Sequence, residues 1–234
     1  MFRFTQHDIP GDPFNLFQTF HVRTGQIAAS IRPMRPPVTH ARAFTLIELL
    51  VVIGIIAILV GLLFPAFKAV QNQARQTQAK NDLTQIVNAV NAFYTDYGKY
   101  PLVTADKIYG STATPNNTLF NVLRGIDTAN NPRQIVFISP PDVKDPNNPR
   151  SGIGTAAANL GRYFDPWGSS YLVEIDGSYD NAVANPYTAN AGATPNLSTG
   201  VIAWSLGADQ NGATAGASGD KNTGVYIDDV ISWQ

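Results

Sequence analysis

The sequence of 234 residues contains no cysteine, and its three histidines, His7, His21 and His40, all lie near its start. Without cysteine no disulfide can close a loop, and no thiol nucleophile is available. The sequence also has no P-loop, no GxSxG motif and no zinc-ligand spacing. Its net charge of −1 provides no strongly basic surface for nucleic acid. We therefore expect neither an enzyme nor a nucleic-acid-binding protein.

Charge is almost missing from the 21 residues between Phe44 and Phe64, where Glu48 is the one ionisable side chain. As a helix this run would span about 31 Å, the thickness of the hydrocarbon core of a bilayer. A carboxylate at mid-bilayer costs roughly 2.5–3.5 kcal/mol, so a lone acid in such a run is by default a functional residue with a partner. The alternative is that Glu48 only reaches out to the lipid headgroups.

Charges of opposite sign flank this apolar run. Residues 1–43 carry a net charge of +3, and residues 44–234 carry −4. Basic residues concentrate on the cytoplasmic side of membrane segments. The sequence therefore predicts a single-pass membrane protein with a cytoplasmic N-terminus and a C-terminal domain on the outer side of the membrane.

The apolar run has two ordinary explanations. A secretory signal peptide needs an A-x-A cleavage site after the run, but Ala41-Arg42-Ala43 lies before it. A plain transmembrane anchor is the other explanation. Such an anchor has no need of Glu48, nor of the helical continuation into polar sequence.

The stretch from Ala43 to Ile55, AFTLIELLVVIGI, resembles the prepilin segment of type IV pilins and type II secretion pseudopilins. The resemblance implies that a prepilin peptidase cuts between Ala43 and Phe44 and methylates the new amino group. Most members have glycine at this position. Ala43 is also a small residue and therefore meets the requirement. The resemblance further implies that Glu48 pairs with the Phe44 amino group of a neighbouring subunit. The pair would then set the stagger of helices in a filament.

The leader before this cleavage point, residues 1–43, is long for the family. A start at Met34 would give a basic leader of ten residues, which is of ordinary length. We therefore expect translation to begin at Met34. Detection of a peptide from residues 1–33 by mass spectrometry would contradict this expectation.

The apolar run continues into a polar segment with no proline or glycine between Ala66 and Tyr97. Apolar residues recur there at spacings of three and four from Leu83 onward, which predicts an amphipathic helix. We expect one helix of about 54 residues, divided into a transmembrane and polymerisation part (44–65) and a spine (66–100). Pro65 should bend or locally unwind it, and Gly98 should end it.

The remaining residues, 101–234, predict a small β-rich domain. A short helix is expected at 118–124, extended segments at 134–139, 170–175, 201–205 and 225–233, and a long exposed loop at 181–200. The simplest assembly is an α+β fold, in which a small antiparallel sheet lies on the long N-terminal helix.

Three motifs in this domain, Asp165-Pro166-Trp167-Gly168, Ser205-Leu206-Gly207-Ala208-Asp209 and the ending Asp228-Asp229-Val230-Ile231-Ser232-Trp233, resemble the major pseudopilin of type II secretion systems. That family holds calcium in the loop after the second motif. The oxygen-rich side chains of this segment suit calcium, which takes six to eight oxygen ligands. The expected ligands are Asp209, Asp229 and the Leu206 carbonyl, with Asp228 or Asp220 as weaker choices. Alternatively, these acids only solvate turns.

The resemblance implies a structural subunit, held in the bacterial inner membrane with its C-terminal domain in the periplasm, that polymerises into a periplasmic pseudopilus driving type II protein secretion. Its expected partners are its own copies, a prepilin peptidase, minor pseudopilins, membrane lipid before assembly, and an inner-membrane platform with a cytoplasmic ATPase. A type IV pilus subunit for adhesion, motility or DNA uptake is the first alternative. A membrane-anchored binding module that never polymerises is the second.

Overall fold

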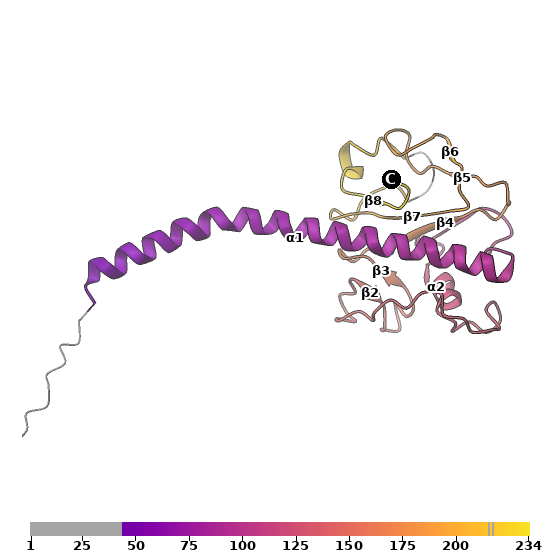
Figure 1. The fold of residues 1–234 in the computed structure, drawn as a ribbon, viewed down its shortest axis with the longest axis horizontal. Coiled ribbons are helices and arrows are strands. Elements are labelled where there is room, and N and C mark those ends of the chain that lie inside the picture. The colour runs from indigo at the N-terminus through magenta and orange to yellow at the C-terminus, as the bar shows by residue number, and fades with distance from the viewer. Residues whose placement is uncertain (1–43, 215, 217) are drawn as a thin grey trace, which may run out of the picture. The chain divides into compact units, whose positions relative to one another are not determined.

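The computed structural model describes residues 44–214, 216 and 218–234, and its longest element is helix α1, Leu46–Tyr97 (Figure 1). The predicted long single helix is confirmed, and the helical backbone continues through position 65. Gly98 follows its last turn with a φ of +69°, and the Gly98 N–H donates to the Tyr94 carbonyl at 2.8 Å. Glycine adopts this left-handed conformation without strain, which is why the helix stops there. Local unwinding at Pro65 within a filament stays a prediction, and the leader, Met34 and Ala43 lie outside the described residues.

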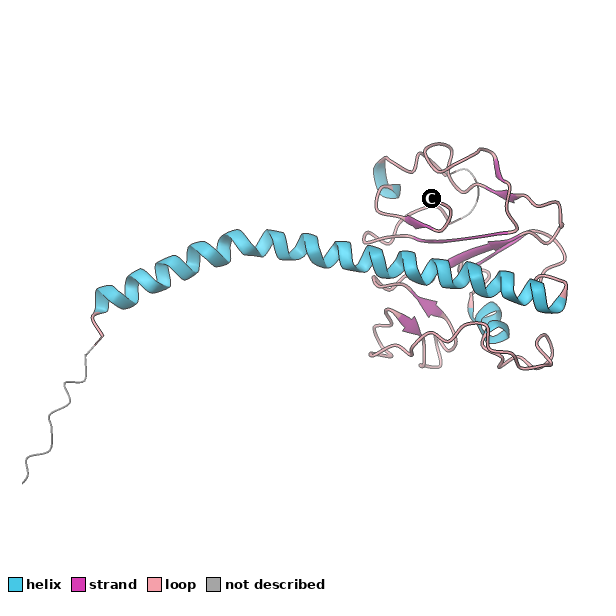
Figure 2. Ribbon diagram, viewed as in Figure 1, coloured by secondary structure: helices cyan, strands magenta, loops and turns pink. Residues whose placement is uncertain are grey.

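The domain after α1 is built around an antiparallel sheet of four strands in the order β1-β4-β7-β8 (Figure 2). Two small two-stranded sheets, β2-β3 and β5-β6, accompany it. The bounds are β1 Lys107–Tyr109, α2 Asn117–Leu123, β2 Gly152–Ile153, β3 Tyr163–Phe164, β4 Leu172–Ile175, β5 Val183–Ala184, β6 Asn196–Leu197, β7 Val201–Ser205, the 3₁₀ helix η1 Gly224–Tyr226 and β8 Val230–Ile231. The expected α+β fold, with an antiparallel sheet on the long helix, is confirmed.

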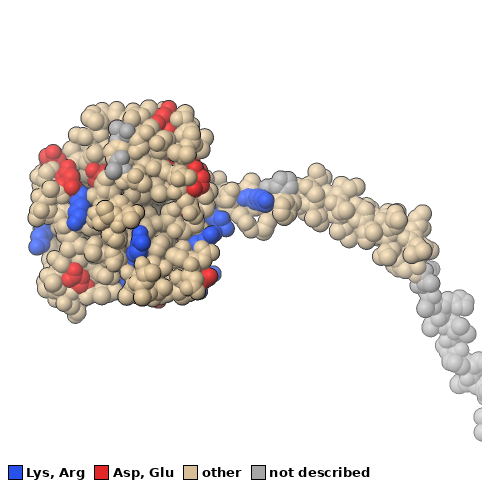
Figure 3. All heavy atoms as spheres, turned by 180° about the vertical axis from the view of Figure 1, so that it is seen from behind, with Lys and Arg blue, Asp and Glu red and all other residues tan. Residues whose placement is uncertain are grey.

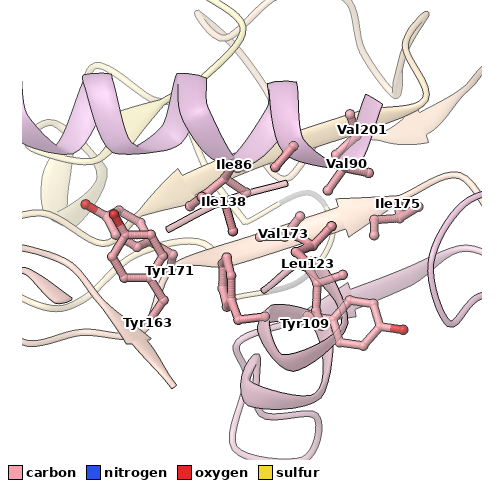
Figure 4. Close-up of a cluster of buried hydrophobic side chains, with 14 of the residues drawn as sticks. Ile86, Val90, Tyr109, Leu123, Ile138, Tyr163, Tyr171, Val173, Ile175 and Val201 are labelled. Atoms are coloured by element: carbon pink, nitrogen blue, oxygen red, sulfur yellow. The ribbon is translucent and has the colours of Figure 1, made fainter. Parts of the chain in front are cut away.

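The C-terminal half of α1 packs on one face of the four-stranded sheet (Figure 4). Alternate residues of a strand point to opposite faces, so Val173 and Ile175 of β4 face the helix. They meet Ile86 and Val90 of α1 in one buried cluster. Helix α2 and the β2-β3 pair add to the same cluster. Its other fully buried members include Leu83, Leu119, Phe120, Leu123 and Tyr171.

The prediction of a long exposed loop at 181–200 is only partly right: residues 192–196 are exposed, but buried residues of the same segment cover the opposite face of the sheet. Tyr187 and Ala191 are fully buried in a second apolar cluster with Trp204. The Asn185 amide donates to the carbonyls of Ala191 and Ala193 at 3.1 and 2.9 Å. These bonds satisfy the polar backbone inside the fold, so a segment of small and polar residues can be buried.

The expected extended segments have a mixed outcome. The strands at 170–175 and 201–205 are confirmed as β4 and β7, and the helix at 118–124 as α2. Residues 134–139 form no strand, because the Phe137 and Ile138 N–H groups donate to the Leu123 carbonyl at the end of α2 instead. The segment 225–233 is extended only over β8, since η1 occupies its beginning.

Candidate functional site

Helix α1 begins with reciprocal hydrogen bonds between Thr45 and Glu48. The Glu48 N–H donates to Thr45 Oγ1 at 3.2 Å, and the Thr45 N–H and hydroxyl donate to Glu48 Oε2 at 3.4 and 3.2 Å. This arrangement is a capping box, which satisfies N–H groups that the first helical turn leaves without partners. The Thr-x-x-Glu spacing that signals such a box stands in the sequence. Glu48 therefore has a partner within its own chain, in addition to the partner expected on a neighbouring subunit.

The capping box holds the Glu48 carboxylate beside Thr45, the residue that follows Phe44. The Phe44 side chain is exposed. Cleavage after Ala43 would turn the Phe44 nitrogen into a charged amino group one residue away from the box. Pairing of Glu48 with that group on a neighbouring subunit, and cleavage itself, stay predictions.

The first half of α1 presents apolar side chains on all sides. Its large hydrophobic residues between Leu46 and Phe64 are 44% to 88% exposed. On the face that Figure 3 shows, no Lys, Arg, Asp or Glu side chain is visible on this part of the helix. Among the described residues, α1 is the one helix long and apolar enough to cross a membrane. A Cβ atom added at Gly54 or Gly61 would meet nothing within 4 Å, so both positions are open to another helix.

Further along α1, Asp82 connects the spine to the sheet domain. The Tyr171 hydroxyl, from the residue before β4, donates to Asp82 Oδ2 at 2.8 Å. Burial raises the pKa of Asp82, while hydrogen bonds from Tyr171 and Tyr163 lower it. The rings of these tyrosines pack edge to face with centroids 4.9 Å apart. A buried acid with two hydroxyl donors fixes where the helix sits along the sheet.

The first two C-terminal motifs are joined by Asp165. Its Oδ1 accepts the N–H groups of Trp167, Gly168 and Ser169 at 2.9, 2.7 and 2.9 Å. Its Oδ2 accepts the Ser205 hydroxyl at 2.5 Å. One fully buried carboxylate thus closes the Asp-Pro-Trp-Gly turn and ties it to the start of the Ser-Leu-Gly-Ala-Asp motif.

The expected calcium ligands are engaged with other partners. Asp228 Oδ2 accepts the N–H groups of Ala208 and Asp209 at 2.5 and 3.0 Å. Asp209 Oδ1 accepts the Asn211 N–H at 2.8 Å. Asp220 Oδ1 accepts the Asn190 side-chain amide at 2.7 Å and thereby turns toward a different loop.

Asp229 is the buried member of this set. Its Oδ2 accepts the Tyr187 hydroxyl at 2.7 Å, and its Oδ1, also buried, has no hydrogen-bond partner. Burial raises the pKa of Asp229 to about 7, although the Tyr187 hydroxyl and Lys221 lower it. Within the part of the chain that the structure describes, no three acidic or histidine side chains gather as a metal site would require. The predicted set, with the Leu206 carbonyl, therefore does not fit a calcium ion held mainly by carboxylates, and calcium binding stays a prediction.

A second buried acid, Glu174 of β4, faces the layer formed by residues 181–200. Its Oε1 accepts the Ala184 N–H at 3.1 Å, and its buried Oε2 has no hydrogen-bond partner. Burial raises the pKa of Glu174 to about 7; the Ala184 N–H opposes this shift and the Asp106 charge adds to it. Glu174 thus binds its proton more tightly in the folded chain than in the unfolded one.

This shift makes the stability of the domain depend on pH. A raised folded-state pKa contributes stability that is fully present below the unfolded value near 4.5 and is lost as the pH rises through about 7. We expect the free energy of unfolding to fall by on the order of 3 kcal/mol between these values. Glu174→Gln should remove this part of the pH dependence in denaturant unfolding of the detergent-solubilised chain. An unchanged slope in that variant would refute the assignment.

Comparison with known proteins finds a methylation motif at the start of α1 and similarity to type IV pilins. Residues 39–64 match the prokaryotic N-terminal methylation motif. The chain is 37% identical over 59 residues to the type IV major pilin protein PilA of Myxococcus xanthus. It is 36% identical over 85 residues to the type IV wide pilus major component PilA4 of Thermus thermophilus.

These similarities cover a limited part of each chain. They span 25% and 36% of this chain, and 27% and 65% of the length of the two relatives, respectively. No solved structure matches.

Proposed function

We propose that this chain, which carries the type IV pilin prepilin signal and is homologous to type IV pilins, is the structural subunit of a periplasmic pseudopilus for type II secretion. The observation that carries the polymerising role is the exposed apolar half of α1 with the Glu48 carboxylate at its head. Such a helix needs an apolar environment along its whole length. Lipid provides that environment before assembly, and like helices provide it afterwards.

In the proposed assembly, prepilin peptidase frees the Phe44 amino group, and an inner-membrane platform with a cytoplasmic ATPase extracts the subunit. The C-terminal domain is periplasmic, and minor pseudopilins join the same filament. In this proposal the chain performs no catalysis, because its pilin relatives are structural proteins. It acts by packing its apolar helix against the helices of other subunits. Glu48 supplies the anion that pairs with a neighbouring Phe44 amino group in a low-dielectric core, where an unpaired charge costs several kcal/mol.

Two features of the chain favour a secretion pseudopilus. The domain carries the three motifs that resemble major pseudopilins, and Asp165 and Ser205 join the first two of them by a hydrogen bond. The chain also has no cysteine with which to close a C-terminal loop. The alternative, a surface type IV pilus, is favoured by the names of the two relatives. Loss of secretion without loss of surface filaments in a strain lacking this chain would support the pseudopilus, and the reverse result would support the pilus.

Assembly should fail when the charge of Glu48 is removed. For Glu48→Ala we expect on the order of 100-fold fewer assembled subunits, because a lost charge pair worth about 3 kcal/mol changes an equilibrium by that factor. The measurement is the amount of filament in sheared or cross-linked fractions from cells that overproduce the chain. Filaments at the wild-type level would show that the chain is a membrane-anchored module that does not polymerise through Glu48.

The capping box provides matched controls for this experiment. Thr45→Val removes the capping hydroxyl and keeps the carboxylate, whereas Glu48→Gln keeps an acceptor for the box and removes the charge. If the charge sets the register, Glu48→Gln should fail like Glu48→Ala, and Thr45→Val should still assemble. The opposite pattern would mean that Glu48 serves only to cap its own helix, at a cost of about 1 kcal/mol when lost.

A further inference from the structure

The apolar surface of α1 extends beyond Phe64. Phe67 and Val70 are both exposed, and so is Lys68 between them. The Lys68 ammonium lies 5.0 Å from the centre of the Phe64 ring. An aromatic ring with a lysine beside it is typical of the boundary between hydrocarbon and lipid headgroups. Insertion of α1 into a membrane therefore brings the headgroup layer to the residues that follow Val70.

The sheet domain begins to cover α1 at this same level. Among the residues of α1 whose side chains the structure describes, all those before Arg75 are exposed, and Arg75 is the first that is partly buried. Arg75 follows Val70 by about 8 Å along the helix, and the headgroup region on each side of a bilayer is about 5–8 Å thick. Side chains of a helix tilt toward its N-terminus. The Arg75 guanidinium therefore reaches back toward the headgroup layer.

A groove lies beside Arg75, between α1 and the loop of residues 141–151. Its volume is about 580 Å³. In Figure 3, Lys and Arg side chains gather where the helix enters the domain. Three of the side chains that line the groove are cations, Arg75, Lys144 and Arg150, and two are acids, Asp142 and Asp145.

The cations of this groove are available to a ligand. Lys144 and Arg150 are exposed. The one ion pair among the described residues joins Arg133 to Asp96, and neither of these lines the groove. The Arg150 Nε donates to the Asn148 side-chain oxygen at 3.3 Å, which leaves its other N–H groups for a ligand. Guanidinium groups bind phosphate oxygens through two parallel hydrogen bonds, and lysine binds them as a point charge.

We propose that this groove binds the headgroup phosphate of an anionic phospholipid and so docks the end of the domain on the membrane that holds α1. Arg75, Lys144 and Arg150 contact the headgroup, and Lys68 lies at the same boundary. The ligand is a lipid rather than a free phosphate, because the apolar surface that ends at Val70 places the groove beside a bilayer. The inference rests on insertion of α1 into a membrane, and it does not depend on which filament the chain joins.

The test uses the full-length chain in a neutral detergent. It is mixed with phosphatidylglycerol, or with phosphatidylcholine of the same acyl chains, and native mass spectrometry counts the lipid that each chain retains. Each cation beside an anionic lipid contributes about fivefold in affinity. We therefore expect the wild type to be half-saturated at about 20-fold less phosphatidylglycerol than phosphatidylcholine. Lys144→Gln combined with Arg150→Gln should remove most of this preference and leave the retention of phosphatidylcholine unchanged.

Matched variants separate the groove from the overall charge of the chain. Lys99→Gln combined with Lys107→Gln removes the same charge from two exposed lysines that do not line the groove, and this variant should keep the preference. Asp142→Asn removes an acid from the groove and should increase the preference. Inorganic phosphate added at constant ionic strength should not displace the lipid, whose acyl chains keep it in the same micelle.

Three results would overturn the proposal. Equal retention of the two lipids by the wild type would leave the groove to another occupant, such as a neighbouring subunit. An equal loss of preference in the two double variants would show that only the total charge matters. Displacement by inorganic phosphate would show that the ligand is not a lipid. The measurement needs no filament, so its result is independent of the proposed role in secretion.

Discussion

Replacing Asp165 by alanine should lower the free energy of unfolding by about 4 kcal/mol or more, which is exceptional for one residue. The substitution removes the acceptor of three backbone N–H groups and of the Ser205 hydroxyl, all around a fully buried carboxylate. Each buried donor left without a partner costs about 1–3 kcal/mol. Denaturant unfolding followed by tryptophan fluorescence measures the effect.

The chain contains a matched control for this substitution. Asp145 also precedes a proline, and its Oδ1 accepts the Asn147 N–H at 2.9 Å, but it is exposed. Asp145→Ala should cost less than about 1 kcal/mol, because water can replace a lost surface hydrogen bond. Asp165→Asn, which keeps one acceptor oxygen, should be intermediate. Equal unfolding midpoints for Asp165→Ala and Asp145→Ala would show that the turn and β7 are not held together by this carboxylate.

The second large effect is expected at Asp82 on the spine of α1. Asp82→Leu has a similar volume but leaves the buried hydroxyl of Tyr171, and with it that of Tyr163, without an acceptor. We expect a loss of about 2–4 kcal/mol in the free energy of unfolding. Because this acid lies between the helix and the sheet, the loss should also increase proteolysis of the spine after residue 66. Limited proteolysis and thermal unfolding of the same sample measure the two effects.

A double variant separates the hydrogen bond from simple packing. Replacing both partners of a buried hydrogen bond by apolar groups of the same shape can be nearly neutral. Asp82→Leu combined with Tyr171→Phe should therefore recover part of the stability that Asp82→Leu loses. If the two losses simply add, the contact between Asp82 and Tyr171 contributes nothing specific.

The elements that the sequence predicted are those whose signal is local. The spacing of Leu83, Ile86, Val90 and Phe93 alone defines the buried stripe of α1. Val201–Ser205 is predicted at its observed bounds because apolar strand-forming residues follow a turn. The signal for processing is also contained in consecutive residues, and residues 39–64 match the methylation motif. At the head of the chain the methylation motif is confirmed, whereas cleavage after Ala43, the pairing of Glu48 with Phe44 and the calcium site all stay predictions.

The errors occur where a residue's structure depends on partners far along the chain. Residues 181–200 resemble an exposed loop by composition, yet part of the segment is buried, where the Tyr187 hydroxyl donates to Asp229 and the Trp233 ring N–H donates to the Ala191 carbonyl, each pair 42 positions apart. Calcium binding stays a prediction, and the acids proposed as its ligands share only their proximity in the sequence. In the structure, Asp220 accepts a hydrogen bond from Asn190, Asp229 accepts one from Tyr187, and Asp228 accepts one from Ala208. The spacing of these acids in the sequence does not reveal that they have different partners.

The all-round apolar surface of the first half of α1 bears on the reversibility of the proposed filament. Lipid tails and leucine-rich helices are about equally apolar, so moving such a helix from bilayer to filament changes its hydrophobic free energy little. The helix is then about equally stable in both locations, so in the proposed assembly the direction of movement would come from the charge at Glu48 and from work supplied by the proposed ATPase. If that work stopped, the proposed filament would be free to release its subunits into the bilayer, which would then hold them for the next round of growth.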